Sequence, residues 1–318
     1  MRLFAGTEIA ALTPYPALID AMARGLARPL VSPPRGVYQP AGAGDVLLTM
    51  PAWRPPQGVA PAGLIGVKLV TVYPANPARG LPSIAGVYVA FDGASGQPRA
   101  VLDGTVLTVR RTAAASALAA RYLAPADAKT LLTIGTGALA PELARAHAAD
   151  HRFAEVMLWG RDSAKAAALA ARLAAEGLPA TASIDLASAV RRADVIVAGT
   201  TARQPFLERG WIRPGSHLSL LGAFTSAMAE ADQATVAAAR LFADTRDGVI
   251  EKGGEVAQAI AAGAIAAERI EADLAGLIAR AGPIARRPDD ITLFKSVGFA
   301  ALDLAAAEFV LERAAAGV

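Results

Sequence analysis

The sequence contains no cysteine, which excludes disulfide bonds, a thiol nucleophile and any metal site with cysteine ligands. Only three histidines are present, and their spacing is not that of a metal-ligand set, so we expect no metal site. The chain also lacks a large excess of positive or negative charge. The net charge is +3 and the basic residues are scattered, which argues against a nucleic acid or a membrane surface as a partner.

Long hydrophobic runs are missing as well. The most apolar long stretch, residues 256–267, is shorter than the roughly 18 uncharged residues that a membrane span needs. The first residues include Glu8 and lack a basic start followed by an apolar core, so we expect no signal peptide. These features together predict a cytoplasmic protein.

The chain has 318 residues, enough for two domains of ordinary size. Its first part reads as β-structure broken by turn residues, with strands expected at residues 67–72, 86–91 and 99–102. A helix is expected at residues 112–123. From residue 129 onward strands and helices alternate, which predicts a Rossmann-like, doubly wound parallel sheet in an α/β protein.

The pattern also suggests where the two domains meet. We expect residues 123–295 to form a Rossmann-type dinucleotide-binding domain. Residues 1–122 with 296–318 are expected to form an α+β domain for substrate binding and dimerisation. Near the end of the chain, residues 255–280 read as helical and residues 296–315 as a final long helix, which Ser296 could cap.

A glycine-rich turn follows the first strand of the alternating region. Gly135, Gly137 and Ala140 have the G-x-G-x-x-G/A spacing of a dinucleotide-binding loop. The glycines allow a sharp turn and close approach to a pyrophosphate, and the following helix start offers unpaired N–H groups. The residues that we expect to bind the cofactor here are Gly135, Thr136, Gly137, Ala138 and Leu139. A purely structural turn is the alternative.

The end of the next strand indicates which cofactor is preferred. NAD enzymes favour Asp or Glu there, because a carboxylate accepts hydrogen bonds from the ribose hydroxyls. This position holds Gly160, followed by Arg161 and Ser163, whose guanidinium and hydroxyl can bind a 2′-phosphate. We therefore expect NADPH to be preferred, with NADH possible. The alternative is that Asp162 contacts the ribose and Arg161 is solvated.

Two further strands end at the edge where such folds bind ligands. Right-handed crossovers would bring the strand ends at Gly135, Thr200 and Gly222 together. Thr200 and Thr201 are therefore candidates for cofactor binding, with a plain strand-end turn as the alternative. His217 lies within a strand, where we interpret it as a core residue rather than an acid.

Several separate motifs, in order along nearly the whole chain, resemble the ornithine cyclodeaminase/mu-crystallin family. They include GVKLVTVYPAN at residues 66–76, TVRRTAA at 108–114, the glycine loop, and TLFKSVG at 292–298. The resemblance implies a homodimeric enzyme with a nicotinamide cofactor. Family members include cyclodeaminases, some alanine dehydrogenases and ketimine reductases.

The resemblance also implies a site for the carboxylate of the substrate. The family uses one lysine and two arginines for it, and the matching positions are Lys68, Arg35 and Arg111. Arginine can hold a carboxylate through two parallel hydrogen bonds, and a buried lysine can bind a charge or donate a proton. Lys68 is therefore the candidate catalytic residue. Without the family, Lys68 and Arg111 would read as a strand-edge lysine and a surface charge opening a helix.

One departure from the family pattern decides between its branches. Cyclodeaminases and the related alanine dehydrogenases carry an aspartate where this sequence has Phe224. Phenylalanine cannot exchange a proton, so deamination should be impaired, whereas hydride delivery to an existing imine needs no such acid. Glu230 or Asp232 could in principle substitute for it.

The sequence thus predicts an NAD(P)H-dependent reductase of small cyclic imino-carboxylates. The expected reactions convert 1-pyrroline-2-carboxylate to L-proline and 1-piperideine-2-carboxylate to L-pipecolate, by hydride transfer to the C=N carbon. The alternatives are ornithine cyclodeaminase or alanine dehydrogenase chemistry on the same scaffold, or a non-catalytic protein that binds NADPH or a small ligand.

Overall fold

The computed structural model describes residues 1–40, 44–58 and 62–317, and it divides into two compact units. Unit 1 comprises Met1–Thr112 and Phe299–Val318, and unit 2 comprises Ala113–Gly298. The sequence placed the boundaries at 122/123 and 295/296. The first boundary falls inside the long helix α3 (Gly104–Leu123), which contributes to both units.

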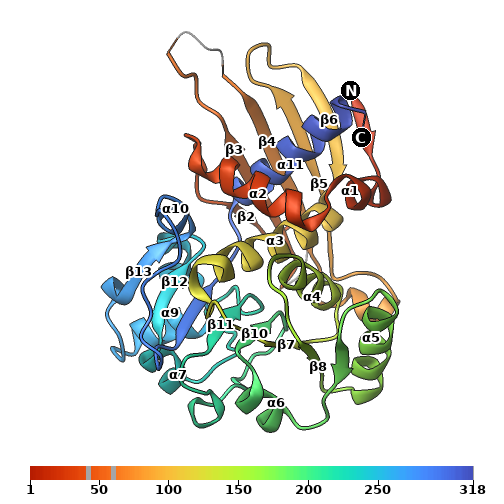
Figure 1. Ribbon diagram of the computed structural model, residues 1–318. Helices are drawn as coiled ribbons and strands as arrows, with labels where there is room; N and C mark the ends of the chain where they lie inside the picture. The colour runs from red at the N-terminus through yellow and green to blue at the C-terminus, as the bar shows by residue number, and fades with distance from the viewer. Residues whose placement is uncertain (41–43, 59–61, 318) are drawn as a thin grey trace. The chain divides into compact units, whose positions relative to one another are not determined.

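Unit 1 is built on a six-stranded sheet in the order β1-β6-β5-β4-β3-β2. Neighbouring strands are antiparallel except for the parallel pair β1 and β6. Helices α2 and α11 lie across one face of this sheet (Figure 1). The strands are β1 (Arg2–Phe4), β2 (Gly36–Tyr38), β3 (Val46–Trp53), β4 (Leu64–Val72), β5 (Ile84–Asp92) and β6 (Pro98–Asp103); the other elements are α1 (Gly6–Leu12), α2 (Tyr15–Ala27), η1 (Asn76–Arg79) and α11 (Ala300–Ala315).

Unit 2 is built on an eight-stranded, wholly parallel sheet in the order β13-β12-β14-β11-β10-β7-β8-β9. Its strands are β7 (Thr130–Ile134), β8 (Glu155–Trp159), β9 (Ala180–Ala182), β10 (Val195–Ala198), β11 (His217–Leu220), β12 (Arg240–Ala243), β13 (Ile270–Asp273) and β14 (Thr292–Lys295). Its helices are α4 (Leu139–Asp150), α5 (Ser163–Ala175), α6 (Leu186–Arg192), α7 (Gln233–Ala238), α8 (Arg246–Lys252), α9 (Glu255–Ala261) and α10 (Leu274–Ile278), with the short turns η2 (Arg209–Trp211) and η3 (Ala267–Arg269). The order reverses between β7 and β10, as in Rossmann folds, which confirms the predicted fold class.

Three expected elements differ from the structure. The helix expected at residues 255–280 is wrong: α9 ends at Ala261, and the segment continues through η3, strand β13 and α10. Gly263 has a φ of +70° just after α9, a conformation that breaks a helix however alanine-rich its surroundings. Helix α3 begins at Gly104 instead of 112, because the Asp103 carboxylate accepts hydrogen bonds from the N–H groups of Thr105 and Val106.

The third correction concerns the last helix. It begins at Ala300, and Ser296 does not cap it. The Ser296 hydroxyl instead donates to Oδ2 of the buried Asp244, 2.8 Å away, and the same oxygen accepts from the N–H groups of Val297 and Gly298. Asp244 therefore fixes the segment that leaves β14.

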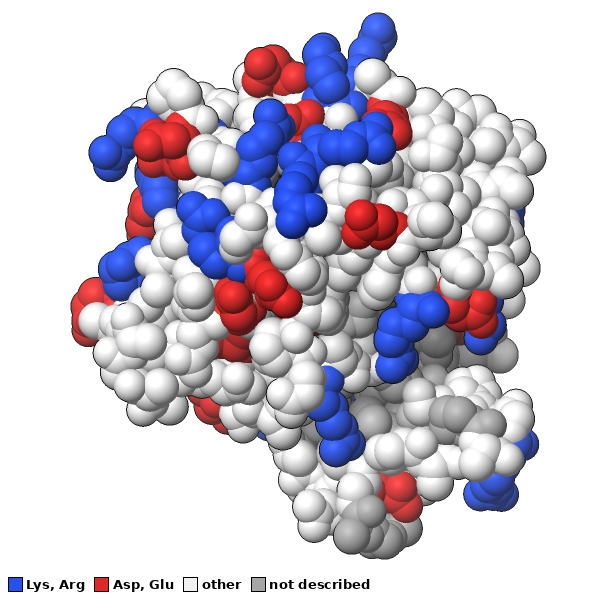
Figure 2. Space-filling view, turned by 90° about the horizontal axis from the view of Figure 1, so that it is seen from below, with Lys and Arg blue, Asp and Glu red and all other residues white. Residues whose placement is uncertain are grey.

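Charged side chains of both signs lie among one another on the face seen in Figure 2. Ion pairs in unit 2 link neighbouring elements, for example Arg240 with Glu271 at 2.7 Å. In the described part of the chain, no helix is both long and apolar enough to cross a membrane.

Candidate active site

The carboxyl ends of the strands of unit 2 form one continuous edge. Ile134, Ala198 and Leu220 lie in one row of the sheet, and the row continues through Lys295 to Ala243. The residues that follow these strand ends therefore share that edge. The glycine loop after β7 and the turns after β10 and β11 come to the same place, where open α/β sheets bind ligands.

The glycine loop has the geometry that a dinucleotide needs. Gly135 has a φ of +123°, which favours glycine, and its N–H donates to the Trp159 carbonyl at 2.8 Å. A Cβ at Gly137 would meet no heavy atom within 4 Å, so the backbone is open to a phosphate. Helix α4 begins two residues later with no side-chain cap. The Ala140 N–H donates to the Gly137 carbonyl at 3.1 Å and Pro141 has no N–H, so the Leu139 N–H is the group at this helix start that can meet a phosphate.

The end of β8 explains why an acid is absent there. A Cβ at Gly160 would come within 2.6 Å of Cγ2 of Thr136, so a larger side chain would press on the glycine loop. Asp162 caps α5, since its carboxylate accepts from the Lys165 N–H at 3.1 Å, and this contact lowers the pKa of Asp162. Arg161 and Ser163 are exposed beside it.

Thr200 and Glu230 form a buried contact at the same edge. The Glu230 carboxylate accepts from both the N–H and the hydroxyl of Thr200 at 2.8 Å, and from the Gly222 N–H at 2.7 Å. Burial raises the pKa of Glu230. Because the N–H and the hydroxyl of Thr200 both donate to Glu230, any contact of Thr200 with a cofactor falls to its carbonyl oxygen, while Thr201 is exposed.

Neither acid that could replace the missing aspartate is free to do so. Glu230 is fully buried in the contact just described. Asp232 caps α7, since its carboxylate accepts from the Thr235 N–H at 2.7 Å. Phe224 packs against the hydrophobic core of unit 2. Another buried acid at this edge, Glu255, is paired with Lys295 at 2.9 Å.

Lys68 lies in unit 1, on the buried face of β4. The strand alternates, so that Leu64, Gly66, Lys68 and Val70 all point into the core. Lys68 is only 2% exposed, and its Nζ lies 2.9 Å from the Asp303 carboxylate on α11. A lysine at a core position of a strand is costly unless its charge is paired, and Asp303 supplies the pair.

Arg111 meets the same carboxylate. Its Nε donates to Oδ1 of Asp303 at 2.9 Å. Arg111 is 4% exposed and sits in the third turn of α3 rather than at the helix start expected from the sequence. Arg110, the neighbour that could be mistaken for it, stacks on the Tyr15 ring at 3.9 Å and donates to the Thr13 hydroxyl.

The charges of this cluster shift one another's ionisation. Burial, together with the nearby Arg111, lowers the pKa of Lys68 to about 8, although Asp303 opposes the shift. Burial alone would raise the pKa of Asp303, but Arg111 and Lys68 outweigh it and hold that pKa below its ordinary value. Arg35, half-buried just before β2, also lowers the pKa of Lys68. Unit 1 therefore gathers Lys68 and Arg111 on one carboxylate, with Arg35 near enough to act on the ionisation of Lys68.

Asp303 is the site residue that the sequence reasoning missed. It is fully buried and belongs to a helix whose neighbouring residues are almost all apolar. A single acid on an otherwise apolar helix face was the available signal, because a buried carboxylate needs a partner.

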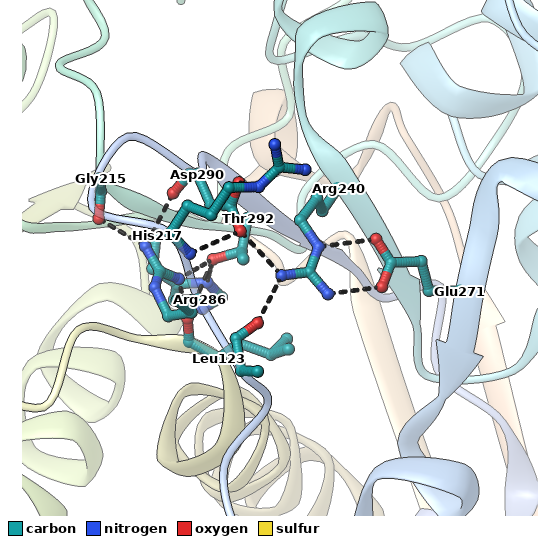
Figure 3. Close-up of polar contacts among 10 residues, drawn as sticks. Leu123, Gly215, His217, Arg240, Glu271, Arg286, Asp290 and Thr292 are labelled. Atoms are coloured by element: carbon teal, nitrogen blue, oxygen red, sulfur yellow. Dashed lines mark hydrogen bonds and ion pairs between the residues drawn. The ribbon is translucent and has the colours of Figure 1, made fainter.

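A second arginine cluster lies at the opposite, amino-terminal edge of the parallel sheet (Figure 3). Arg286 donates to the Gly215 carbonyl at 2.5 Å and to the Thr292 hydroxyl at 2.7 Å. The Thr292 hydroxyl donates to the Leu123 carbonyl, so it accepts from Nδ1 of His217 at 2.9 Å. These contacts join the first residues of β11 and β14 to the end of α3. They lie at the opposite end of the strands from the glycine loop, so we interpret the cluster as structural.

The buried histidines of unit 2 predict sensitivity to acid. Burial lowers the pKa of His147 to about 3, whereas it is near 6.5 in the unfolded chain. Between about pH 3 and pH 6.5 His147 is protonated in the unfolded chain but neutral in the folded protein. His147 should therefore lower the free energy of unfolding by about 1.4 kcal/mol for each pH unit below about 6.

Chemical unfolding measured at several pH values checks this expectation. The His147→Gln variant should lose less stability on acidification than the wild-type protein. If the free energy of unfolding falls equally steeply with decreasing pH in the two proteins, the pKa of His147 is not lowered in the folded state.

Comparison with known proteins identifies the fold and the family of this chain. The fold is that of the Rossmann-type dinucleotide-binding proteins, joined here to a second unit with a buried cationic cluster. The sequence profile of the ornithine cyclodeaminase/mu-crystallin family matches residues 9–318, and the chain belongs to this family. The family predicted from the sequence is thus confirmed.

Similar proteins carry reductase names. The Delta(1)-pyrroline-2-carboxylate reductase of Paracoccus denitrificans is 40% identical over 246 residues, 77% of this chain and 78% of the relative. The Delta(1)-pyrroline-2-carboxylate/Delta(1)-piperideine-2-carboxylate reductase of Azospirillum brasilense is 38% identical over 308 residues, 96% of this chain and 93% of the relative. The solved structure of Thermococcus litoralis Delta(1)-pyrroline-2-carboxylate reductase in complex with NADH and L-proline matches with a TM-score of 0.92 and 28% identity, covering 100% of this chain and 98% of that one.

Proposed function

We propose that this protein is an NAD(P)H-dependent reductase of cyclic ketimine carboxylates. Its substrates are 1-pyrroline-2-carboxylate, which becomes L-proline, and 1-piperideine-2-carboxylate, which becomes L-pipecolate. The observation that carries the proposal is the buried cluster of Lys68 and Arg111 on Asp303, in a chain that resembles such reductases over almost its full length. Cations this deeply buried are rare unless they bind a ligand or form an ion pair. Here two cations share one protein carboxylate, which leaves binding capacity for a ligand.

The substrate side of the reaction belongs to unit 1. Lys68, Arg111 and Arg35 bind the carboxylate of the imine and fix its orientation, which a hydride transfer to one carbon requires. Lys68, with its pKa lowered to about 8, also has a proton to give at neutral pH. We assign it the catalytic role.

The cofactor side belongs to unit 2. The open backbone at Gly137 and the uncapped start of α4 suit a pyrophosphate, and the residues assigned to the cofactor run from Gly135 to Leu139 with Thr200 and Thr201. The bound cofactor supplies the hydride. We further propose that NADPH is preferred, because Arg161 and Ser163 are exposed after β8 while the Asp162 carboxylate is occupied in capping α5.

Two other functions on this scaffold are less well supported. Ornithine cyclodeaminase or alanine dehydrogenase chemistry lacks its acid, since Phe224 packs into the core and Glu230 is committed to Thr200. A non-catalytic binding protein would have no use for a buried lysine whose pKa is lowered to about 8. Both alternatives can be separated from the reductase in solution.

The assembly and location also belong to the proposal. Unit 1 exposes several apolar side chains on its sheet, including Val37, Ile84 and Val87 at 59%, 43% and 42% exposure. An exposed apolar set of this kind is typical of an interface, and we propose a homodimer that forms through it. We place the enzyme in the cytoplasm, where the nicotinamide cofactors are available.

A paired assay tests the choice of function. The protein is incubated with L-ornithine and NAD, and ammonia and L-proline are measured; we expect neither. Thermal shift is then measured with NADPH and with pyrrole-2-carboxylate, a planar ring carboxylate, and both should raise the melting temperature. Ammonia release would identify a cyclodeaminase, and a response to the cofactor alone would favour the binding protein.

A further inference from the structure

We propose that Asp303 is the positioning residue of the substrate site, and that it holds Lys68 and Arg111 in the arrangement that receives the carboxylate of the imine. This role rests on the proposed function of the same site. Asp303 touches no substrate in this scheme and acts through the two cations that do.

The contacts that Asp303 makes leave the binding groups of both cations available. Lys68 has three N–H donors, and its Nζ lies 2.9 Å from the carboxylate. Arg111 approaches the same carboxylate through Nε alone. Among the described residues, the two terminal nitrogens of Arg111 have no other hydrogen-bond partner, and this pair of nitrogens is the part of a guanidinium that grips a carboxylate. Asp303 therefore holds both cations in place while the terminal nitrogens of Arg111 stay open to a substrate carboxylate.

Electrostatics gives Asp303 a second task. Lys68 and Arg111 are both buried and repel one another, so that Arg111 lowers the pKa of Lys68. Asp303, facing them from α11, opposes that shift and keeps Lys68 protonated to a higher pH. Arg35, before β2, adds to the repulsion, while Tyr88 on β5 stays a neutral phenol because burial raises its pKa. Because the two buried cations Lys68 and Arg111 share the single carboxylate of Asp303, the cluster is left to accept one more carboxylate.

Helix α11 offers a matched comparison. Glu308 forms a buried pair with Arg54, accepting from its Nε at 2.9 Å and from a terminal nitrogen at 2.6 Å. Arg54 also donates to the Arg28 carbonyl, which ties α11 to the end of α2. Removing the Glu308 charge thus breaks a buried ion pair on the same helix without touching Lys68 or Arg111.

The test compares Asp303→Asn with Glu308→Gln in the full-length protein. The pH dependence of kcat/KM is measured with 1-piperideine-2-carboxylate at saturating NADPH. Activity needs Lys68 protonated, so the wild-type enzyme should lose activity as the pH rises through about 8. In Asp303→Asn we expect this alkaline limb to move down by about one pH unit and KM to rise about tenfold. Glu308→Gln should keep the wild-type limb.

An alkaline limb that stays in place in Asp303→Asn would overturn the proposal, because a purely structural role lowers activity without moving it. If Asp303→Asn does not fold, Asp303→Glu replaces it. That variant keeps the charge but displaces it by one methylene, so the limb should stay at the wild-type pH while KM rises. An unchanged KM in Asp303→Glu would equally overturn the positioning role.

Binding measurements separate this proposal from the proposed function. If the wild-type protein reduces neither imine, the function fails. Calorimetric binding of pyrrole-2-carboxylate then still tests Asp303, since the ring nitrogen of this probe does not titrate in the pH range used. Binding lost in Asp303→Asn and kept in Glu308→Gln supports the positioning role, and equal binding by both variants contradicts it.

Discussion

Replacement of Lys68 by methionine is expected to lower kcat/KM for 1-piperideine-2-carboxylate about a thousandfold, from the combined loss of a proton donor and a charged carboxylate contact. Methionine fills much the same volume on the buried face of β4, so the fold should survive. Among the described residues, Asp303 then keeps only Arg111 as its partner, and the charge of Asp303 opposes the incoming carboxylate. Steady-state kinetics at pH 7 measures the loss, and cofactor binding should be unaffected.

A surface lysine provides the control for this result. Lys129 is exposed just before β7, and Lys129→Met should retain wild-type kinetics. If Lys68→Met kept its activity within about threefold of wild type, a change of less than 1 kcal/mol, Lys68 would be a structural lysine paired with Asp303 and nothing more.

Replacement of Arg161 by alanine is expected to raise KM for NADPH about 30-fold while leaving KM for NADH within about threefold, since a charge-assisted hydrogen bond to phosphate contributes about 2 kcal/mol. Only NADPH carries the 2′-phosphate that the guanidinium would bind. Arg161 is exposed in the loop after β8, so its loss should not affect stability. Arg172→Ala, in the last turn of α5, removes an exposed charge from the same helix and serves as the control.

Equal losses with the two cofactors would show that Arg161 does not read the 2′-phosphate. In that case the ribose would be recognised without it. Asp162 would be the next residue to test, although its carboxylate already accepts the Lys165 N–H.

Local patterns in the sequence were sufficient to predict the fold of unit 2. The G-x-G-x-x-A spacing at Gly135 and the regular alternation of strands and helices depend on residues close in the chain. The high alanine content of the chain led to the wrong assignment of residues 255–280 as one helix. Alanine favours helix everywhere, so only tertiary pairing with β12 and the turn at Gly263 reveal strand β13.

The substrate site shows a different limit. The alternation of β4 places Lys68 on the buried face, which the sequence pattern could indicate. Its partner Asp303 is 235 residues away, and no local pattern pairs them. Likewise, Glu230 could be named as a candidate acid from the sequence, but only the structure shows that Thr200 and Gly222 occupy its carboxylate.

The oxidation of NADPH in the presence of 1-piperideine-2-carboxylate or 1-pyrroline-2-carboxylate tests the central claim most directly. Loss of the absorbance of the reduced nicotinamide, with L-pipecolate or L-proline formed in equal amount, is the predicted result, and NADH should be used less efficiently. No imine-dependent oxidation of either cofactor, at protein concentrations where both ligands bind, would contradict the assignment of this protein as a ketimine reductase.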